Sequence, residues 1–257
     1  MRLLLPSAVL WLSTSALADL TLVNETIAMG KTRTVTLSAK GPKAFFEMKE
    51  ADAPSRTMLR DGDAKKLFII DHPKKTVLVI TEQDSKQMEE KQAALRAQLQ
   101  AQLAKMPPEQ RARMESGMLA QLDPKPMVFA YEKKKTPARK VAGYSCQDYT
   151  IKRDGQPSGE GCFTSWKDLG ISGDEFKNVM LKAMPAQMNP MSTAAFEASD
   201  TAPGYPVWRT HVNAEGQVTS EVTLKSFSKT AVAAPNFELP KDYAQKSMAE
   251  SMAPPKK

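Results

Sequence analysis

The only two cysteines of the chain, Cys146 and Cys162, are spaced as expected for a disulfide within one β-hairpin. If they face each other directly, Lys152 lies opposite Gln156. The loop is then Arg153-Asp154-Gly155, a three-residue connection that favours Gly at its last position. Directly opposite residues place their Cβ atoms about 4.5 to 5.5 Å apart, close to disulfide geometry. We therefore expect a cross-strand disulfide, with two free buried thiols as the alternative.

A row of methionines offers a second kind of sulfur chemistry. Thioether ligands select copper(I), so near-helical spacing of four methionines raises the alternative of a copper site. Pro185 and Pro190 interrupt the helix that would align them, and no His or Cys joins the row. Apolar packing is therefore favoured over metal binding. The row consists of Met180, Met184, Met188 and Met191.

The remaining reactive residues form no recognisable catalytic set. His72 follows a strand and precedes Pro73, and His211 lies in a predicted strand, each without a second ligand at metal spacing. The sequence contains neither a Gly-x-Ser-x-Gly elbow nor a Gly-rich phosphate loop. We expect a protein that is not an enzyme and that uses no cofactor or metal.

The N-terminus has the pattern of a secretory signal peptide, residues 1–18. Arg2 precedes an apolar run that is too short to span a bilayer, and Ala16-Leu17-Ala18 supplies a small-residue cleavage site. Lipidation is not expected, because no cysteine lies near Asp19. No second long apolar run follows. We expect a periplasmic or secreted protein without a transmembrane segment in its mature chain, in a compartment where a disulfide persists.

Short alternating segments separated by polar turns predict a meandering antiparallel sheet rather than alternating strands and helices. One domain, residues 19–246, would hold this sheet, followed by a disordered tail, residues 247–257. The expected strands are 20–28, 32–38, 43–49, 56–60, 66–71, 74–81, 127–132, 205–212 and 217–228.

Residues 82–122 interrupt the strand pattern and predict an inserted helical hairpin. An apolar stripe includes Met88 and continues beyond Pro107-Pro108 into a second helix. The two helices either complete an ordinary core or form a movable cover over the concave face of the sheet. A further helix begins near Ser172, where Ser172 and Glu175 have the spacing of a capping box. The fold class is therefore α+β.

A basic cluster separates two of the expected strands. It could contact phospholipid headgroups or an acidic partner, but a solvated turn interrupted by Pro137 is the favoured interpretation. Binding of nucleic acid is not expected, because aromatic residues are not interleaved with the charges. The cluster comprises Lys133, Lys134, Lys135, Arg139 and Lys140.

Four short motifs resemble a bacterial family of exported domains of unknown function. They are Gly30 to Arg33, Ile69 to Asp71, Val141 to Cys146 and Phe237 to Tyr243. That family is similar in strand plan to the outer-membrane lipoprotein carriers, the LolA/LolB-like superfamily. The resemblance implies an unclosed β-barrel, with helices over its concave side and a cavity that holds acyl chains.

We expect the protein to bind a lipid, an acyl chain or a lipidated peptide between the sheet and its helices. The alternatives are a scaffold that meets an envelope protein partner through the helical hairpin, and a methionine-based copper binder. Residues expected to line the apolar cavity are Phe68, Val77, Val79, Leu95, Leu99, Leu103, Met114 and Met118.

Overall fold

A computed structural model describes residues 19–107, 127–183, 201–232 and 237–252. The expected signal peptide and second helix of the hairpin, with Met114 and Met118, lie outside the described residues. The same holds for Met184, Met188 and Met191.

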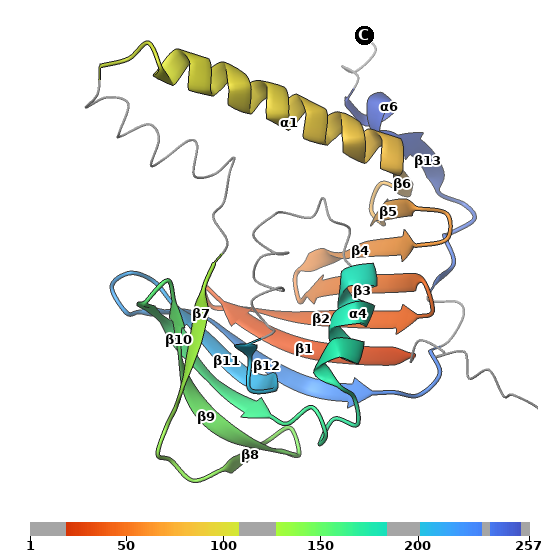
Figure 1. Ribbon diagram of the computed structural model, residues 1–257. Helices are drawn as coiled ribbons and strands as arrows, with labels where there is room; N and C mark the ends of the chain where they lie inside the picture. The colour runs from red at the N-terminus through yellow and green to blue at the C-terminus, as the bar shows by residue number, and fades with distance from the viewer. Residues whose placement is uncertain (1–18, 108–126, 184–200, 233–236, 253–257) are drawn as a thin grey trace, which may run out of the picture.

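Within these described ranges, thirteen strands form one curved, open sheet (Figure 1). All pairings are antiparallel except that of β13 with β6, and the order is β13-β6-β5-β4-β3-β2-β1-β12-β11-β10-β9-β7, with β8 beside β9. The predicted α+β class and the unclosed sheet are confirmed. The strands are β1 (Leu20–Ala28), β2 (Lys31–Lys40), β3 (Lys43–Glu50), β4 (Ala53–Asp61), β5 (Lys66–Asp71), β6 (Thr76–Thr81), β7 (Phe129–Lys133), β8 (Arg139–Val141), β9 (Tyr144–Arg153), β10 (Gln156–Thr164), β11 (Tyr205–Val212), β12 (Val218–Ser228) and β13 (Ala244–Ser247).

Helix α4 (Gly173–Ala183) lies across the concave face (Figure 1). Ser172 begins it as predicted, since its hydroxyl accepts a hydrogen bond of 3.0 Å from the Glu175 amide. Phe176 and Val179 of this helix belong to one buried cluster, together with side chains from β1, β2 and β9 to β12. Strands far apart in the sheet order can meet in this way only on the concave side. The sheet contributes Leu20, Leu22, Leu37, Ala39, Cys146, Cys162, Tyr205, Val207 and Leu224.

The convex face of β3 to β5 has its own small core. Leu59 is 3% exposed and packs with Val232 and Phe237 from the C-terminal part of the chain. Phe45 and Phe68 join this cluster, because register places them on either side of Leu59. The C-terminal segment therefore covers the back of the sheet.

The chain end is ordered further than the sequence indicates. A disordered tail is expected from residue 247, but Ser247 closes strand β13 and helix α6 (Met248–Met252) follows. Ser247 begins that helix, donating its hydroxyl to Glu250 and accepting from the Glu250 amide. Strand β13 pairs in parallel with β6 and covers what would otherwise be a sheet edge.

The predicted disulfide joins Cys146 and Cys162, with a Cα separation of 5.3 Å, but the expected register is wrong. Cys162 lies opposite Asp148. The turn has two residues rather than three, because Asp154 and Gly155 both adopt positive φ (51° and 79°), as a two-residue hairpin requires. A bulge at Pro157 to Gly159 shifts the register further.

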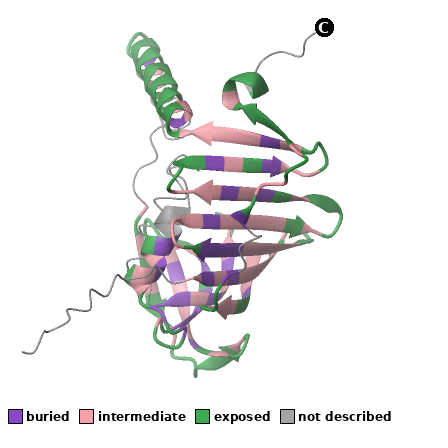
Figure 2. Ribbon diagram, turned by 90° about the vertical axis from the view of Figure 1, so that its right-hand side faces the viewer, coloured by how far each residue is buried: buried purple, intermediate pink, exposed green. Residues whose placement is uncertain are grey.

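Helix α1 (Glu82–Leu103) extends from the end of β6 away from the sheet (Figures 1 and 2). Thr81 caps it through a reciprocal pair of hydrogen bonds with Asp84. Ser85 is buried against the sheet, whereas Leu95 is 48% exposed. The first helix of the expected hairpin therefore exists, but α1 does not lie over the concave face as a cover would.

Candidate ligand-binding site

An apolar hollow of about 580 Å³ lies beside α4 on strands β3 to β5. Phe46, Met58 and Ile69 occupy successive strands in direct register, so their side chains form one row on the concave face. This row continues from Leu37, which α4 covers. The complete lining is Phe46, Met48, Pro54, Ser55, Arg56, Thr57, Met58, Ile69, Ile70, Asp71 and Pro73.

The hollow exposes apolar side chains that an ordinary core would bury. Ile69 is 36% exposed, and Met58 is only half-buried, although both sit in the middle of their strands. Helix α4 packs on β3, at the border of this region. Two methionines contribute flexible, polarizable side chains, which adapt to apolar ligands of different shapes.

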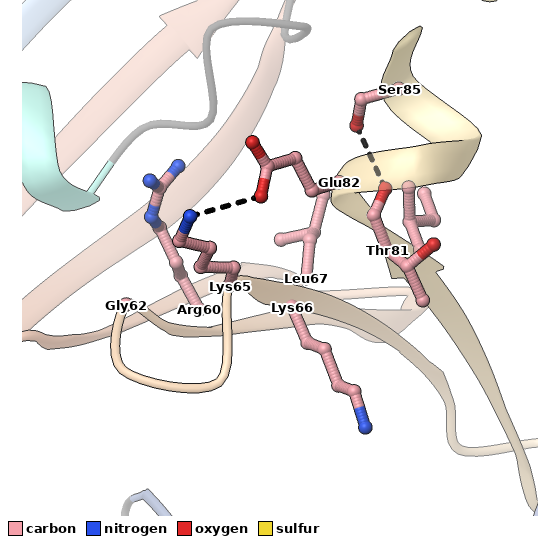
Figure 3. Close-up of a pocket in the computed structure, with 9 residues that line it drawn as sticks. Arg60, Gly62, Lys65, Lys66, Leu67, Thr81, Glu82 and Ser85 are labelled. Carbon is pink, nitrogen blue, oxygen red and sulfur yellow. Dashed lines mark hydrogen bonds and ion pairs between the residues drawn. The ribbon is translucent and has the colours of Figure 1, made fainter. Parts of the chain in front are cut away.

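A second, more polar hollow of about 340 Å³ lies where α1 leaves the sheet (Figure 3). Arg60 rises from β4, and Lys65 projects from the following turn to meet Glu82 of α1 at 3.1 Å. Lys66 points away from this pair in Figure 3. The lining also includes Gly62, Leu67, Ile80, Thr81 and Ser85.

The turn that carries Lys65 is held at both ends. The Gly62 amide donates to the Pro42 carbonyl at 3.0 Å, and the Ala64 amide donates to Asp61 Oδ1 at 3.0 Å. This second bond is the main reason that the pKa of Asp61 lies below its usual value. A Cβ at position 62 would lie 2.6 Å from the Pro42 carbonyl oxygen, so only glycine allows this close approach.

Arg60 is partly desolvated in this hollow. Its Nε atom is buried and has no hydrogen-bond partner within the described part of the chain. Burial lowers the pKa of the guanidinium group from its ordinary value. Ala44 is its neighbour on β3. An unpaired buried donor is costly unless a ligand or solvent satisfies it.

The two hollows belong to the same face of the same strands. Met58 and Arg60 are two residues apart on β4, and Ile69 and Leu67 are their partners on β5. At about 3.3 Å per residue, the Cα atoms of Met58 and Arg60 are separated by about 7 Å. The concave face thus changes from apolar to cationic over one step of the pleat.

The expected lining residues that the structure describes lie outside both hollows. Phe68 and Val79 are paired on the convex face, where Phe68 joins the C-terminal core, and Val77 is fully buried opposite Ile70 on that face. A strand pattern gives two faces without saying which is concave, and this assignment was wrong. On α1, Leu95 is exposed, Leu99 is half-buried and Leu103 is buried.

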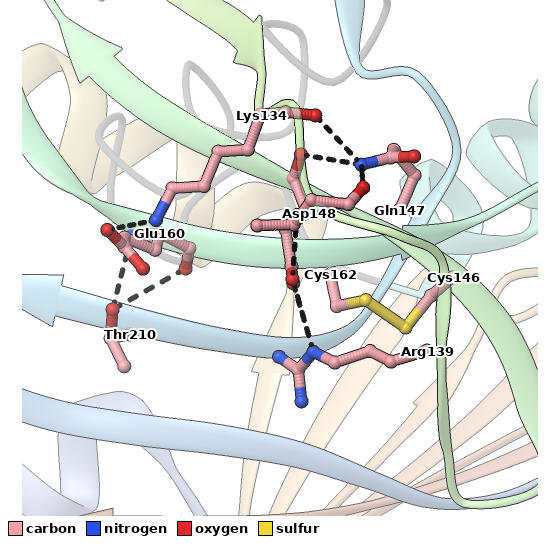
Figure 4. Close-up of polar contacts among 9 residues, drawn as sticks. Lys134, Arg139, Cys146, Gln147, Asp148, Glu160, Cys162 and Thr210 are labelled. Carbon is pink, nitrogen blue, oxygen red and sulfur yellow. Dashed lines mark hydrogen bonds and ion pairs between the residues drawn. A yellow bond between two sulfur atoms is a disulfide. The ribbon is translucent and has the colours of Figure 1, made fainter.

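Two members of the basic cluster form ion pairs, and the other three are exposed (Figure 4). Lys134 forms an ion pair with Glu160, and Arg139 lies 3.1 Å from Asp148 and stacks over Trp208. The other three lysines of the cluster, Lys133, Lys135 and Lys140, are exposed. Strand β8 replaces part of the expected solvated turn.

Within the described ranges, no group of three or more His, Cys, Asp or Glu side chains could hold a metal ion. None of the helices there is both long enough and apolar enough to cross a membrane.

The described chain is thus an α+β protein with one curved, open sheet and two adjoining hollows on its concave face. Residues 125–243 match a family model described as "Domain of unknown function (DUF4412)". This match begins before β7 and ends at Tyr243, so it covers the disulfide hairpin but neither hollow. A comparison with curated proteins finds no match.

Several solved structures are similar over most of the chain. An uncharacterised conserved protein from Thermus thermophilus shares 8% identity, with 90% of this chain and 91% of that chain covered and a TM-score of 0.45. A structure of MucB shares 12% identity over 89% of this chain and 60% of that chain, at a TM-score of 0.38. The structure of the Pseudomonas aeruginosa MucA/MucB complex shares 9% identity over 89% of this chain and 58% of that chain, at a TM-score of 0.39.

Proposed function

We propose that this is a non-enzymatic protein of an extracytoplasmic compartment that binds an apolar ligand, such as a lipid or acyl chain, on the concave face of its sheet. The observation that carries the proposal is the apolar hollow of about 580 Å³ beside α4. Ligand sites are typically concave, mostly apolar and about 300 to 1,000 Å³ in volume.

Burial of ligand surface would supply the affinity. Each methylene group removed from water contributes about 0.8 kcal/mol, before the costs of ordering the ligand. Met58 and Ile69 offer the exposed apolar surface on which those groups would pack. The Cys146–Cys162 disulfide supports the proposed compartment, because such bonds persist under oxidising conditions.

The test is titration of the purified protein with the neutral fluorescent probe N-phenyl-1-naphthylamine. Met58→Glu places a charge in the hollow and should weaken binding at least about tenfold, because the carboxylate must be desolvated or must exclude the probe. Met58→Leu conserves apolar volume and should bind as the natural protein does. Unchanged affinity in a folded Met58→Glu variant would refute the proposal.

The projection of α1 favours a second function, a scaffold that contacts an envelope protein. Leu95 is 48% exposed in the middle of the helix and would be a contact residue. A photo-crosslinking residue at position 95 should then give one defined adduct in the native envelope, whereas the same residue at Val218, which is 63% exposed on the sheet, should not. Equal labelling at the two positions would exclude a specific role of α1.

A further inference from the structure

The second hollow, around Arg60, Lys65 and Glu82, is called the cationic hollow below. It favours a charged group in the ligand, which the apolar hollow does not. Arg60 Nε is buried and lacks a partner among the described residues, and the neighbouring Lys65 pairs with Glu82. Arg60 and Lys65 are positively charged and Glu82 is negatively charged, so these three side chains give the hollow a net positive charge. Lys66, although part of the lining, is turned away from the pair (Figure 3).

We propose that the Arg60–Lys65 hollow binds the anionic head, a carboxylate or phosphate, of an amphiphile whose apolar chain lies over Met58 and Ile69. This inference rests on the proposed function and specifies its ligand class. Arg60 supplies the main contact, since a guanidinium group donates in a planar fork that matches both anions. Lys65 offsets the charge of Glu82, so Arg60 carries the excess positive charge of the hollow.

The start of α1 does not itself form the anion site. Asp84 accepts hydrogen bonds from the Thr81 amide at 2.8 Å and the Thr81 hydroxyl at 2.6 Å, so a carboxylate of the chain already occupies this helix end. The Ser85 hydroxyl donates to the Thr81 carbonyl at 3.1 Å. Recognition therefore depends on the side chains of Arg60 and Lys65.

The geometry fits one molecule rather than two independent ligands. Arg60 follows Met58 on the same face of β4, about 7 Å along the strand. Leu67 and Ile80, which are opposite each other on β5 and β6, continue the apolar surface into the cationic hollow. A head group on Arg60 would thus leave its chain directed along the row of Met58 and Ile69.

The experiment compares dodecanoate, dodecanol and inorganic phosphate, each as a competitor of bound N-phenyl-1-naphthylamine, with calorimetry for phosphate alone. The natural protein should prefer dodecanoate over dodecanol by about tenfold, the effect of one charge-assisted contact. Arg60→Gln should remove this preference while retaining dodecanol binding, which also shows that the variant is folded. Arg60→Lys should keep part of the preference, and Lys66→Gln should keep all of it.

The outcomes separate the two proposals. Equal affinity of the natural protein for dodecanoate and dodecanol would overturn the head-group site and leave the apolar site standing. Failure of both to bind would overturn both. Binding of inorganic phosphate that Arg60→Gln abolishes, without any preference for dodecanoate, would identify a free-anion site and overturn the amphiphile.

Discussion

The Nδ1 atom of His72 lies 3.0 Å from the Tyr243 hydroxyl, although the two residues are 171 positions apart in the sequence. On the other side of the ring, His72 Nε2 lies 3.0 Å from the hydroxyl of Thr57, which is buried in β4. One neutral imidazole can donate through one nitrogen and accept through the other. His72 therefore fastens the C-terminal segment to the middle of the sheet.

Tyr243→Phe should destabilise the protein by about 1 kcal/mol, the net contribution of one hydrogen bond. Thr57→Val should have a similar effect at the other nitrogen. Because both contacts share one ring, the double variant should lose less than the sum of the single losses, by about 0.5 kcal/mol or more. Urea denaturation of the natural protein, the two single variants and the double variant measures this coupling. Strictly additive losses would argue against coupling of the two contacts through His72.

Loss of the disulfide should lower the free energy of unfolding by about 3 kcal/mol, as expected for a loop of this length. The cysteines are separated by 16 residues, and Cys162 is fully buried. The measurement is guanidinium denaturation of the oxidised protein and of the Cys146→Ala, Cys162→Ala double variant. A difference below about 1 kcal/mol would mean that the packing around α4 alone holds this hairpin in place.

Gly159→Ala should be severely destabilising, by about 3 kcal/mol or more. Gly159 has φ +142° beside the bulge, and an added Cβ would lie 2.0 Å from the Thr210 carbonyl oxygen. The control is Gly216→Asn, because Gly216 has φ +79° with open space around it, and asparagine tolerates this region. Thermal unfolding should separate the two variants clearly, and similar melting temperatures would contradict the steric explanation.

The protein should lose stability as the pH falls from about 6.5 towards 4. Burial, with smaller effects of the nearby Arg209 and Arg153 guanidinium groups, lowers the pKa of His211 from 6.5 to about 4. Between these values the unfolded chain binds a proton that the native protein does not, so stability rises with pH. The contribution of neutral His211 is thus complete above about pH 6.5 and is lost on acidification.

Melting temperatures of the natural protein and of His211→Gln, measured across this range, test the assignment. The variant should show a shallower decline, because its side chain does not titrate. Parallel curves would assign the acid sensitivity to other groups.

Local patterns predicted most of the strands. Leu20–Ala28, Lys66–Asp71 and Tyr205–Val212 have the predicted bounds, and Ser172 marks the start of α4. These signals depend on neighbouring residues only. The disulfide was likewise predictable, but its register was not, because Asp154-Gly155 suits a two-residue turn and the bulge at Gly159 adds a second shift.

Long-range features left weaker signals. The parallel pairing of β13 with β6 depends on contacts between segments far apart in the sequence. The four exposed residues of β13, Ala244–Ser247, carry no apolar alternation. The faces of β4 to β6 could not be assigned to core or cavity, because both bear apolar side chains. Arg60 was missed for this reason. The position of Arg60 two residues after Met58 was nevertheless a usable signal of an amphipathic face.

The late position of β13 also has a consequence for how the chain folds. The edge of β6 stays open until the last strand docks, although the neighbouring hairpins can form from local contacts. Loop closure over such a distance is slow compared with hairpin formation, so a partly folded species with an unpaired β6 should accumulate. Unpaired edges recruit strands from other molecules. Chains truncated before Ala244 should therefore self-associate during refolding, even where the two hollows have already formed.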